Sequence, residues 1–145
     1  MKKFLVAAFA FIAVAASAAD VTVSSVRDIN TDRYGSRVEL SAGKLGFITP
    51  TISVTDVGAV YTRYGVGGVA EVAKLGPVAI TANLSGVYQN SVNADNGAGL
   101  VYGVKAGLPL TKSLSATVGV ERFTGDTRVA NFNGNAVTAG LTWKF

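Results

Sequence analysis

The fold is decided by the stretch Val137-Thr138-Ala139-Gly140-Leu141-Thr142-Trp143-Lys144-Phe145. Its odd-numbered side chains are apolar, whereas its even-numbered side chains are small, polar or charged. Because successive side chains of a β-strand point to opposite faces, this alternation predicts a strand whose two faces meet different surroundings.

The start of the chain has the three parts of a secretory signal peptide. Lys2 and Lys3 give a cationic start, residues 4–16 carry no charge, and small residues surround a cleavage point after Ala18 or Ala19. A membrane-spanning helix is the alternative, but such an uncharged run rises only about 20 Å, short of the roughly 30 Å hydrocarbon core. We therefore expect residues 1–19 to be removed on export, leaving a single domain over residues 20–145.

The composition argues against several classes of protein. Charged residues make up only 15% of the chain, against about 25% in a typical soluble domain. The charges are scattered rather than gathered into a basic run, which argues against a nucleic-acid partner. With neither Cys nor His, the chain lacks disulfides, thiolate or imidazole metal ligands, and the base of a Ser-His-acid hydrolase. We expect no enzyme activity, no cofactor and no metal.

Alternation of the same kind recurs in up to eight segments, at residues 21–28, 35–43, 47–55, 60–73, 77–89, 98–107, 113–123 and 135–145. The first segment is the least regular, because its alternation changes parity midway. Short turns such as Gly43-Lys44-Leu45-Gly46 alternate with longer Asn/Asp/Gly-rich loops at residues 28–35, 90–97 and 124–134. This organisation predicts an all-β fold, an eight-stranded antiparallel up-and-down transmembrane β-barrel whose two ends face different compartments.

The distribution of charge indicates which face points outward. In the expected second to eighth strands the apolar face carries one charged side chain, Arg122, near a strand end. The opposite face carries many glycines and hydroxyls together with Arg37, Glu39, Arg63, Glu71, Lys105, Glu121 and Lys144. Small residues among a few long charged ones are typical of the narrow interior of an eight-stranded barrel. We therefore expect the apolar face to contact lipid; a soluble, lipocalin-like exported barrel is the alternative.

Aromatic residues fall at two levels of the apolar face, as expected for membrane-interface girdles. Tyr64, Tyr88 and Tyr102 lie nearer the end with long loops, whereas Trp143 and Phe145 lie at the end with short turns. The alternative is that these are ordinary core aromatics of a β-sandwich.

On the signal peptide, the alternating segments and the terminal aromatic strand, the chain resembles the small eight-stranded outer-membrane barrels: the OmpA transmembrane domain, OmpX and the opacity-type proteins. The resemblance implies a Gram-negative-type outer membrane as the location, with outer-membrane lipid or lipopolysaccharide around the barrel. It also implies that the barrel-assembly machinery reads the strand ending in Phe145. We expect a monomer with both termini and the short turns in the periplasm.

Buried carboxylates need partners, so the interior charges are expected to form pairs. We predict a pair between Glu71 and Lys105, and a second between Glu121 and either Arg63 or Arg37. Such pairs either plug and rigidify the barrel or line a narrow path for ions.

Two functions remain open on the sequence alone. The first is a structural or surface-interaction role, with long-loop contacts at Asp32, Arg33, Asp126, Arg128 and Phe132. The alternative is a narrow pore for ions or small solutes, which the glycine-rich interior would favour.

Overall fold

The computed structural model describes residues 20–126, 128–129 and 132–145. The expected signal peptide, residues 1–19, lies outside these described residues. Nowhere in the described ranges is there a helix with the length and apolar character needed to cross a membrane.

Eight strands make up the fold: β1 (Asp20–Asp28), β2 (Arg33–Ser41), β3 (Thr49–Val57), β4 (Tyr61–Leu75), β5 (Val78–Ser91), β6 (Gly97–Pro109), β7 (Leu114–Gly125) and β8 (Gly134–Lys144). Each strand corresponds to one alternating segment of the sequence, and most boundaries differ from the expected ones by only one or two residues.

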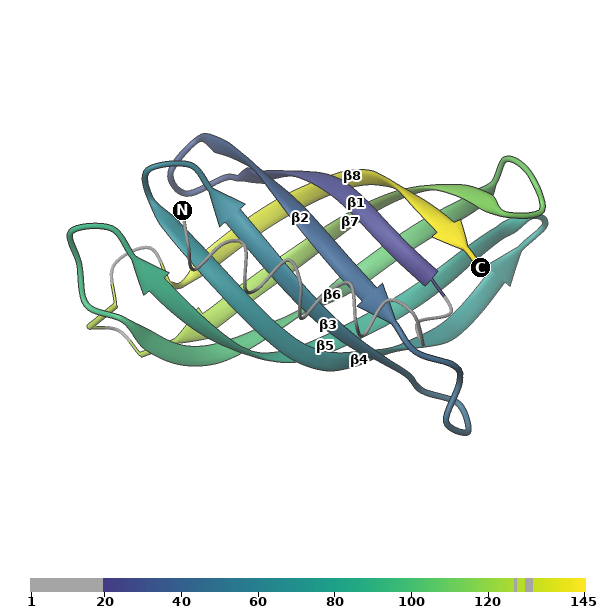
Figure 1. Ribbon diagram of the computed structural model, residues 1–145, viewed down its shortest axis with the longest axis horizontal. Coiled ribbons are helices and arrows are strands. Elements are labelled where there is room, and N and C mark those ends of the chain that lie inside the picture. Colours follow the sequence, from purple (N-terminus) through teal and green to yellow (C-terminus); the bar gives the residue numbers. More distant parts are fainter. Residues whose placement is uncertain (1–19, 127, 130–131) are drawn as a thin grey trace.

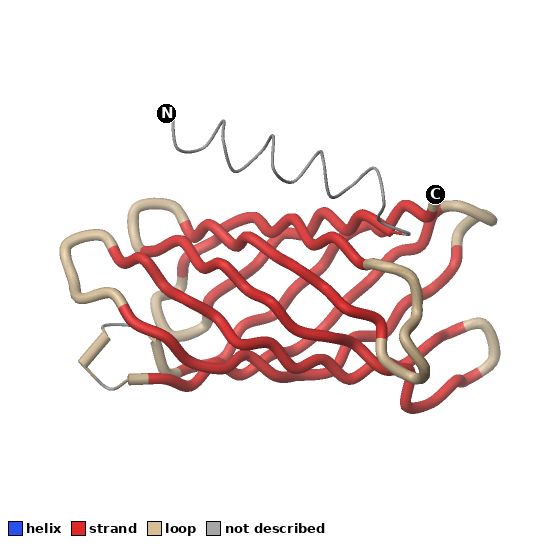
Figure 2. Tube along the Cα trace, turned by 60° about the horizontal axis from the view of Figure 1, so that its bottom comes forward, coloured by secondary structure: helices blue, strands red, loops and turns tan. Residues whose placement is uncertain are grey.

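The strands close into a barrel in chain order. Each strand pairs antiparallel with the next, and β8 pairs with β1 from Asp20↔Lys144 to Asp28↔Ala136. Figure 1 shows β1 beside β8, and Figure 2 shows the strands crossing the long axis at a steep tilt. Closure leaves no free sheet edge, because every strand has two neighbours. The predicted all-β, eight-stranded antiparallel barrel is confirmed.

The lengths of the connections differ less between the two ends of the barrel than the sequence predicts, because the connection 29–32 is short and the connection 42–48 is long. We call the end where β1 begins and β8 ends the terminus end; it also carries the connections 42–48, 76–77 and 110–113. The other end, the loop end, carries the connections 29–32, 58–60, 92–96 and 126–133.

The connection between β2 and β3 is longer than the expected turn at Gly43–Gly46. It runs over residues 42–48 and is closed by a bridge between Leu45 and Ile48, whose backbone N and O atoms lie 2.8 Å apart. Gly46 takes a φ of 66°, a left-handed conformation that glycine adopts without strain. The third strand consequently starts at Thr49 rather than at Phe47.

Strand β1 alternates without the parity change that its sequence indicates. Thr22, Ser24, Val26 and Asp28 are all buried, and the residues between them face outward. The expected strand is therefore confirmed, and its polarity pattern changes midway because Val26 points into the barrel, where the interior near the loop end is apolar.

Candidate functional site: the barrel interior and its outer face

The middle of the interior is occupied by an ion pair between β2 and β7. Arg37 Nη1 donates a hydrogen bond of 2.7 Å to Glu121 Oε1, and the two side chains are only 8% and 1% exposed. The Arg37 Nε atom donates to Thr55 Oγ1 on β3 at 2.7 Å. The guanidinium therefore ties β2, β3 and β7 together from the inside.

Lys105 on β6 extends this pair into a network. Its Nζ atom lies 3.0 Å and 2.9 Å from the two carboxylate oxygens of Glu39, and 4.0 Å from Glu121 Oε1. Asn83 adds a hydrogen bond to Glu121 Oε1 at 3.3 Å. The charges of Arg37, Glu39, Lys105 and Glu121 thus lie together in one cluster, hereafter the ion network.

The predicted pair between Glu71 and Lys105 is wrong. Lys105 contacts Glu39 and Glu121 instead, and Glu71 is exposed near the terminus end. A β-bulge between Glu71 and Ala73 shifts the register of β4 against β5 at this point. Such a bulge bends the strand locally, and alternation in the sequence does not reveal it.

Arg63 lies in an aromatic environment nearer the loop end. Its guanidinium carbon is 4.0 Å from the ring centre of Tyr61, 3.8 Å from that of Phe123 and 5.3 Å from that of Phe132. Its Nε atom donates to Gln89 Oε1 at 2.7 Å. Of the two arginines predicted to pair with Glu121, Arg37 makes the direct hydrogen bond, whereas Arg63 stacks on aromatic rings.

The interior at the loop end is an apolar core. It consists of Val26, Val87, Val101, Phe123, Val129, Phe132 and Ala136. Beside it, the Tyr61 hydroxyl donates to Asp28 Oδ2 at 2.7 Å, and Asp28 Oδ1 accepts from the backbone N–H groups of Asn30 and Thr31.

Phe132 was expected to be an exposed loop contact, and that prediction is wrong. The side chain is 0% exposed and packs into the barrel mouth. Gly99 and Gly125 make room for it, because a Cβ atom at either position would overlap the Phe132 ring. The signal that could have located Phe132 is this pair of glycines on neighbouring strands, which only the register brings together.

The free space inside the barrel lies mostly toward the terminus end. A polar cavity of about 290 Å³ opens there; its lining includes Asp20, Glu39, Glu71, Lys74, Lys105 and Lys144, together with hydroxyls such as Thr22 and Thr138. In the middle, around the ion network, only about 10 Å³ remains. The side chains that the structure describes therefore fill the interior above the terminus-end cavity.

Some interior glycines are needed for the ion network to fit. A Cβ atom on Gly119 would lie 2.8 Å from Lys105 Cγ, and one on Gly103 would lie 2.8 Å from the Glu121 Cα atom. Small residues therefore stand opposite the long charged ones, as expected for a narrow barrel.

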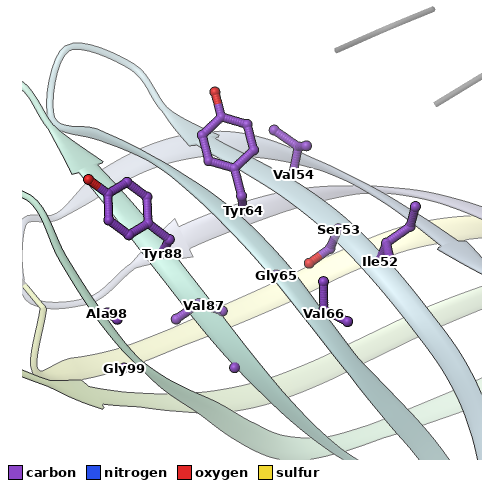
Figure 3. A pocket seen from close by; sticks show the side chains of 11 residues that line it. Ile52, Ser53, Val54, Tyr64, Gly65, Val66, Val87, Tyr88, Ala98 and Gly99 are labelled. Carbon is purple, nitrogen blue, oxygen red and sulfur yellow. The ribbon is translucent and has the colours of Figure 1, made fainter. Parts of the chain in front are cut away.

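The outer face is apolar over most of its height. Val66, Leu84, Val104, Val118 and Val120 are all exposed there. Tyr64 and Tyr88 are register partners and project side by side from this face (Figure 3). Below their rings lies a depression of about 570 Å³ that Ile52, Val54, Val66 and Ala98 help to line.

The predicted interface aromatics all point outward. Tyr64, Tyr88 and Tyr102 are about half exposed, Trp143 is 40% exposed and Phe145 is 86% exposed. Near Trp143 and Phe145, the terminus end also exposes Leu45 and Phe47 in the β2–β3 connection, two residues that sequence analysis did not single out.

Of the other predicted loop contacts, Asp32, Arg33 and Arg128 are exposed at the loop end, whereas Asp126 is half-buried there. Arg27 on β1 forms an ion pair of 2.8 Å with Asp32, and Arg33 follows at the start of β2. Arg128 Nη2 lies 2.7 Å from Asp126 Oδ2, and this hydrogen bond lowers the pKa of Asp126 from 3.8 to about 2. The Asp126–Arg128 pair lies within one connection, whereas the Arg27–Asp32 pair joins β1 to the connection that follows it, so both pairs order the loop end locally.

The described part of the interior holds ion pairs and hydrogen bonds. Each carboxylate of the ion network contacts a cation. Within the described ranges, no group of His, Cys, Asp and Glu side chains is arranged to hold a metal ion. What this arrangement does chemically is to hold together, across the interior, strands that are not neighbours in the sheet: β2 with β7 and β2 with β6.

No protein-family model matches the chain, and neither does any curated protein. Among solved structures, the chain is similar to the crystal structure of Neisserial surface protein A (NspA), with 17% sequence identity and a TM-score of 0.48 over 87% of this chain and 94% of that one. The fold assignment rests on the strand pairing itself, and no functional assignment follows from a likeness at this level.

Proposed function

We propose that this chain is an integral outer-membrane β-barrel with a structural or surface-interaction role and no catalytic activity. The observation that carries the proposal is the inversion of polarity: an ion network lies inside the barrel, and large apolar side chains cover its outside. In water this arrangement would be unfavourable, because it exposes a continuous apolar surface while the charges that could solvate that surface lie inside. In a bilayer it matches the outward apolar band of transmembrane barrels.

In the proposed orientation the terminus end faces the periplasm and the loop end faces the cell exterior. The longest connection, residues 126–133, lies at the loop end, and the longer loops of such barrels are typically external. Residues 1–19 would then be a signal peptide removed on export. The strand ending in Phe145 would be the segment that the barrel-assembly machinery reads, and lipid or lipopolysaccharide would surround a monomer.

Fractionation with a heat-modifiability assay tests the membrane placement. We expect the protein in the outer-membrane fraction, released only by detergent, and migrating differently on gels with and without boiling. Release into a periplasmic extract without detergent would instead support the soluble exported barrel.

A pair of lysine substitutions makes the test specific to the outer face. Val118 is exposed near the middle of β7, whereas Val92 is exposed in the β5–β6 connection. A lysine at mid-bilayer depth on the lipid face of a barrel costs about 2–4 kcal/mol, so Val118→Lys should impair membrane folding strongly. Val92→Lys is the matched control and should fold like the unmodified chain. Equal folding of the two variants would refute a lipid-facing β7.

The surface-interaction half of the proposal rests on the exposed residues Asp32, Arg33 and Arg128 of the loop end, and on the half-buried Asp126 that pairs with Arg128. Shortening the connections that carry them should change a cell-surface property while leaving the heat-modifiable barrel intact. An unchanged cell-surface property would contradict the surface-interaction role, and only the structural role would remain.

A narrow pore is the second candidate, favoured by the terminus-end cavity of about 290 Å³ that reaches Lys105. Recording from purified protein in a planar bilayer discriminates between the two functions. Conductance steps that change when Lys105 is neutralised would favour the pore. A baseline without steps would remove it, as expected from the filled interior around the ion network.

A further inference from the structure

One cation stands apart on the apolar outer face. The charged side chains that point outward from the described strands are Arg27, Asp56 and Arg122. Arg27 pairs with Asp32 at 2.8 Å, and Asp56 accepts a hydrogen bond of 3.2 Å from Thr62. Arg122 is exposed and makes no ion pair or side-chain hydrogen bond with any residue that the structure describes.

The neighbours of Arg122 are polar groups at the same level of the barrel. Its register partners are Tyr102 on β6 and Asn135 on β8, and all three side chains are exposed on the outer face. Directly opposed residues of antiparallel strands have Cβ atoms about 5 Å apart, so the three side chains can reach one ligand together. They offer a guanidinium, a phenol and an amide, all hydrogen-bond donors, and no carboxylate lies in this row.

The next row toward the terminus end is purely apolar. Val120 stands below Arg122, and its register partners across β6 and β5 are Val104 and then Ala82. An outward groove of about 640 Å³ is lined by these three residues, by Arg122 with its two register partners, and by Ile29 near the loop end. The part of the groove nearer the loop end is therefore rich in hydrogen-bond donors, and the part nearer the terminus end is apolar.

We propose that this groove binds the phosphate-bearing headgroup of one anionic lipid of the surrounding bilayer. Arg122 takes the phosphate, helped by Tyr102 and Asn135, and an acyl chain lies over Ala82, Val104 and Val120. A planar guanidinium recognises phosphate oxygens through paired hydrogen bonds, which a single uncompensated Arg on an apolar face can supply. Its position three residues before the end of β7 places it at headgroup height, where a charged side chain is tolerated. This proposal rests on the membrane placement proposed above.

The test is native mass spectrometry of the purified protein in micelles doped with dioleoyl-phosphatidylglycerol or with dioleoyl-phosphatidylcholine. The variants are Arg122→Gln and, as a matched control, Arg27→Gln, which removes an outward arginine that already has a partner. We expect one phosphatidylglycerol retained by the unmodified protein and by Arg27→Gln, and retention about tenfold weaker in Arg122→Gln, as for the loss of one charge-assisted contact.

Several results would overturn the lipid site. These are no retained phosphatidylglycerol, equal retention by Arg122→Gln, equal retention of phosphatidylcholine, or displacement of the lipid by millimolar inorganic phosphate. Heat-modifiable mobility and outer-membrane fractionation of the same variants are read separately. If they show a membrane barrel while lipid retention is independent of Arg122, only the lipid site fails; if the protein fractionates as soluble, the proposed function fails.

Discussion

Arg37 and Glu121 meet inside the barrel, where Arg37 Nη1 lies 2.7 Å from Glu121 Oε1 and both side chains are almost completely buried. The pair joins β2 to β7, strands that are not neighbours in the sheet. It therefore holds the cylinder across its interior, in addition to the backbone hydrogen bonds around its wall.

Removing one partner of this pair should be strongly destabilising. Glu121→Ala leaves Arg37 as a buried cation without its carboxylate, which typically costs about 3–5 kcal/mol, whereas Lys105 keeps its contact with Glu39. Urea titration of the protein folded in lipid vesicles, followed by the heat-modifiable gel shift, measures the free energy of unfolding. Glu71→Ala is the control, because Glu71 is exposed, and its effect should stay below about 1 kcal/mol. Similar losses for the two variants would contradict the network.

Phe132 should behave as a core residue despite its place in a connection. Phe132→Ala removes a fully buried ring from the surroundings of Arg63, Gly99 and Gly125, and should cost about 3–5 kcal/mol of unfolding free energy. Phe47→Ala is the matched control, because Phe47 is 79% exposed. If Phe132→Ala left the free energy of unfolding unchanged in the same urea titration, the folded protein would lack the apolar core at the loop end.

The glycines that cradle Phe132 should not accept a methyl group. Gly99→Ala would push a Cβ atom into the Phe132 ring and the Thr124 carbonyl oxygen, and overpacking of this kind costs about 1–3 kcal/mol. At Gly107 the nearest atom to such a Cβ is 3.8 Å away, which is an ordinary contact. Gly107→Ala should therefore leave the urea midpoint unchanged or raise it slightly. A lower urea midpoint for Gly107→Ala than for Gly99→Ala would contradict the packing of Gly99 against Phe132.

The pair between Asp126 and Arg128 should give the loop end an acid-dependent order. The hydrogen bond from Arg128 lowers the pKa of Asp126 to about 2, below its ordinary value of 3.8. The pair therefore stabilises the β7–β8 connection fully above pH 3.8, and this stabilisation is lost as the pH falls through about 2. Carbon-13 NMR titration of the Asp126 carboxyl in micelles measures the shift.

Arg128→Gln is the control for that titration. Without the guanidinium the pKa of the carboxyl should rise from about 2 toward 3.8, and it should stay below 3.8 because the backbone N–H of residue 128 still donates to Asp126 Oδ1. An unchanged titration in Arg128→Gln would show that the pair does not form in solution.

The strands were predictable because alternation is a local property of the sequence. All eight segments became strands, and Arg37, Glu39, Lys105 and Glu121 lie inside as their parity indicates. Which charge meets which was not predictable, because it depends on contacts across the interior as well as on register. Glu71 and Lys105 share a row of the register through Thr81, yet the Lys105 side chain reaches Glu39 and Glu121 instead.

The loop end differs from the rest of the interior for a different reason. The rule that interior residues are polar and outer residues apolar holds in the middle of the barrel. It fails at Val26 and Phe132, because the mouth of the barrel is filled by side chains packed against each other like those of a soluble core. An apolar residue in the barrel mouth faces inward, so a prediction from its polarity alone places it wrongly on the outer face.

The central claim is that the apolar outer face of the barrel contacts lipid, and the fluorescence of Trp143 tests it most directly. Trp143 is the one tryptophan of the chain, and it points outward near the terminus end with 40% of its side chain exposed. The protein is reconstituted in bilayers of phosphatidylcholine brominated at different acyl depths, with aqueous iodide as the second quencher. We expect bromine to quench Trp143, most strongly at the shallowest depth, with weak quenching by iodide. Emission that iodide quenches and bromine at every depth leaves unchanged would contradict the account.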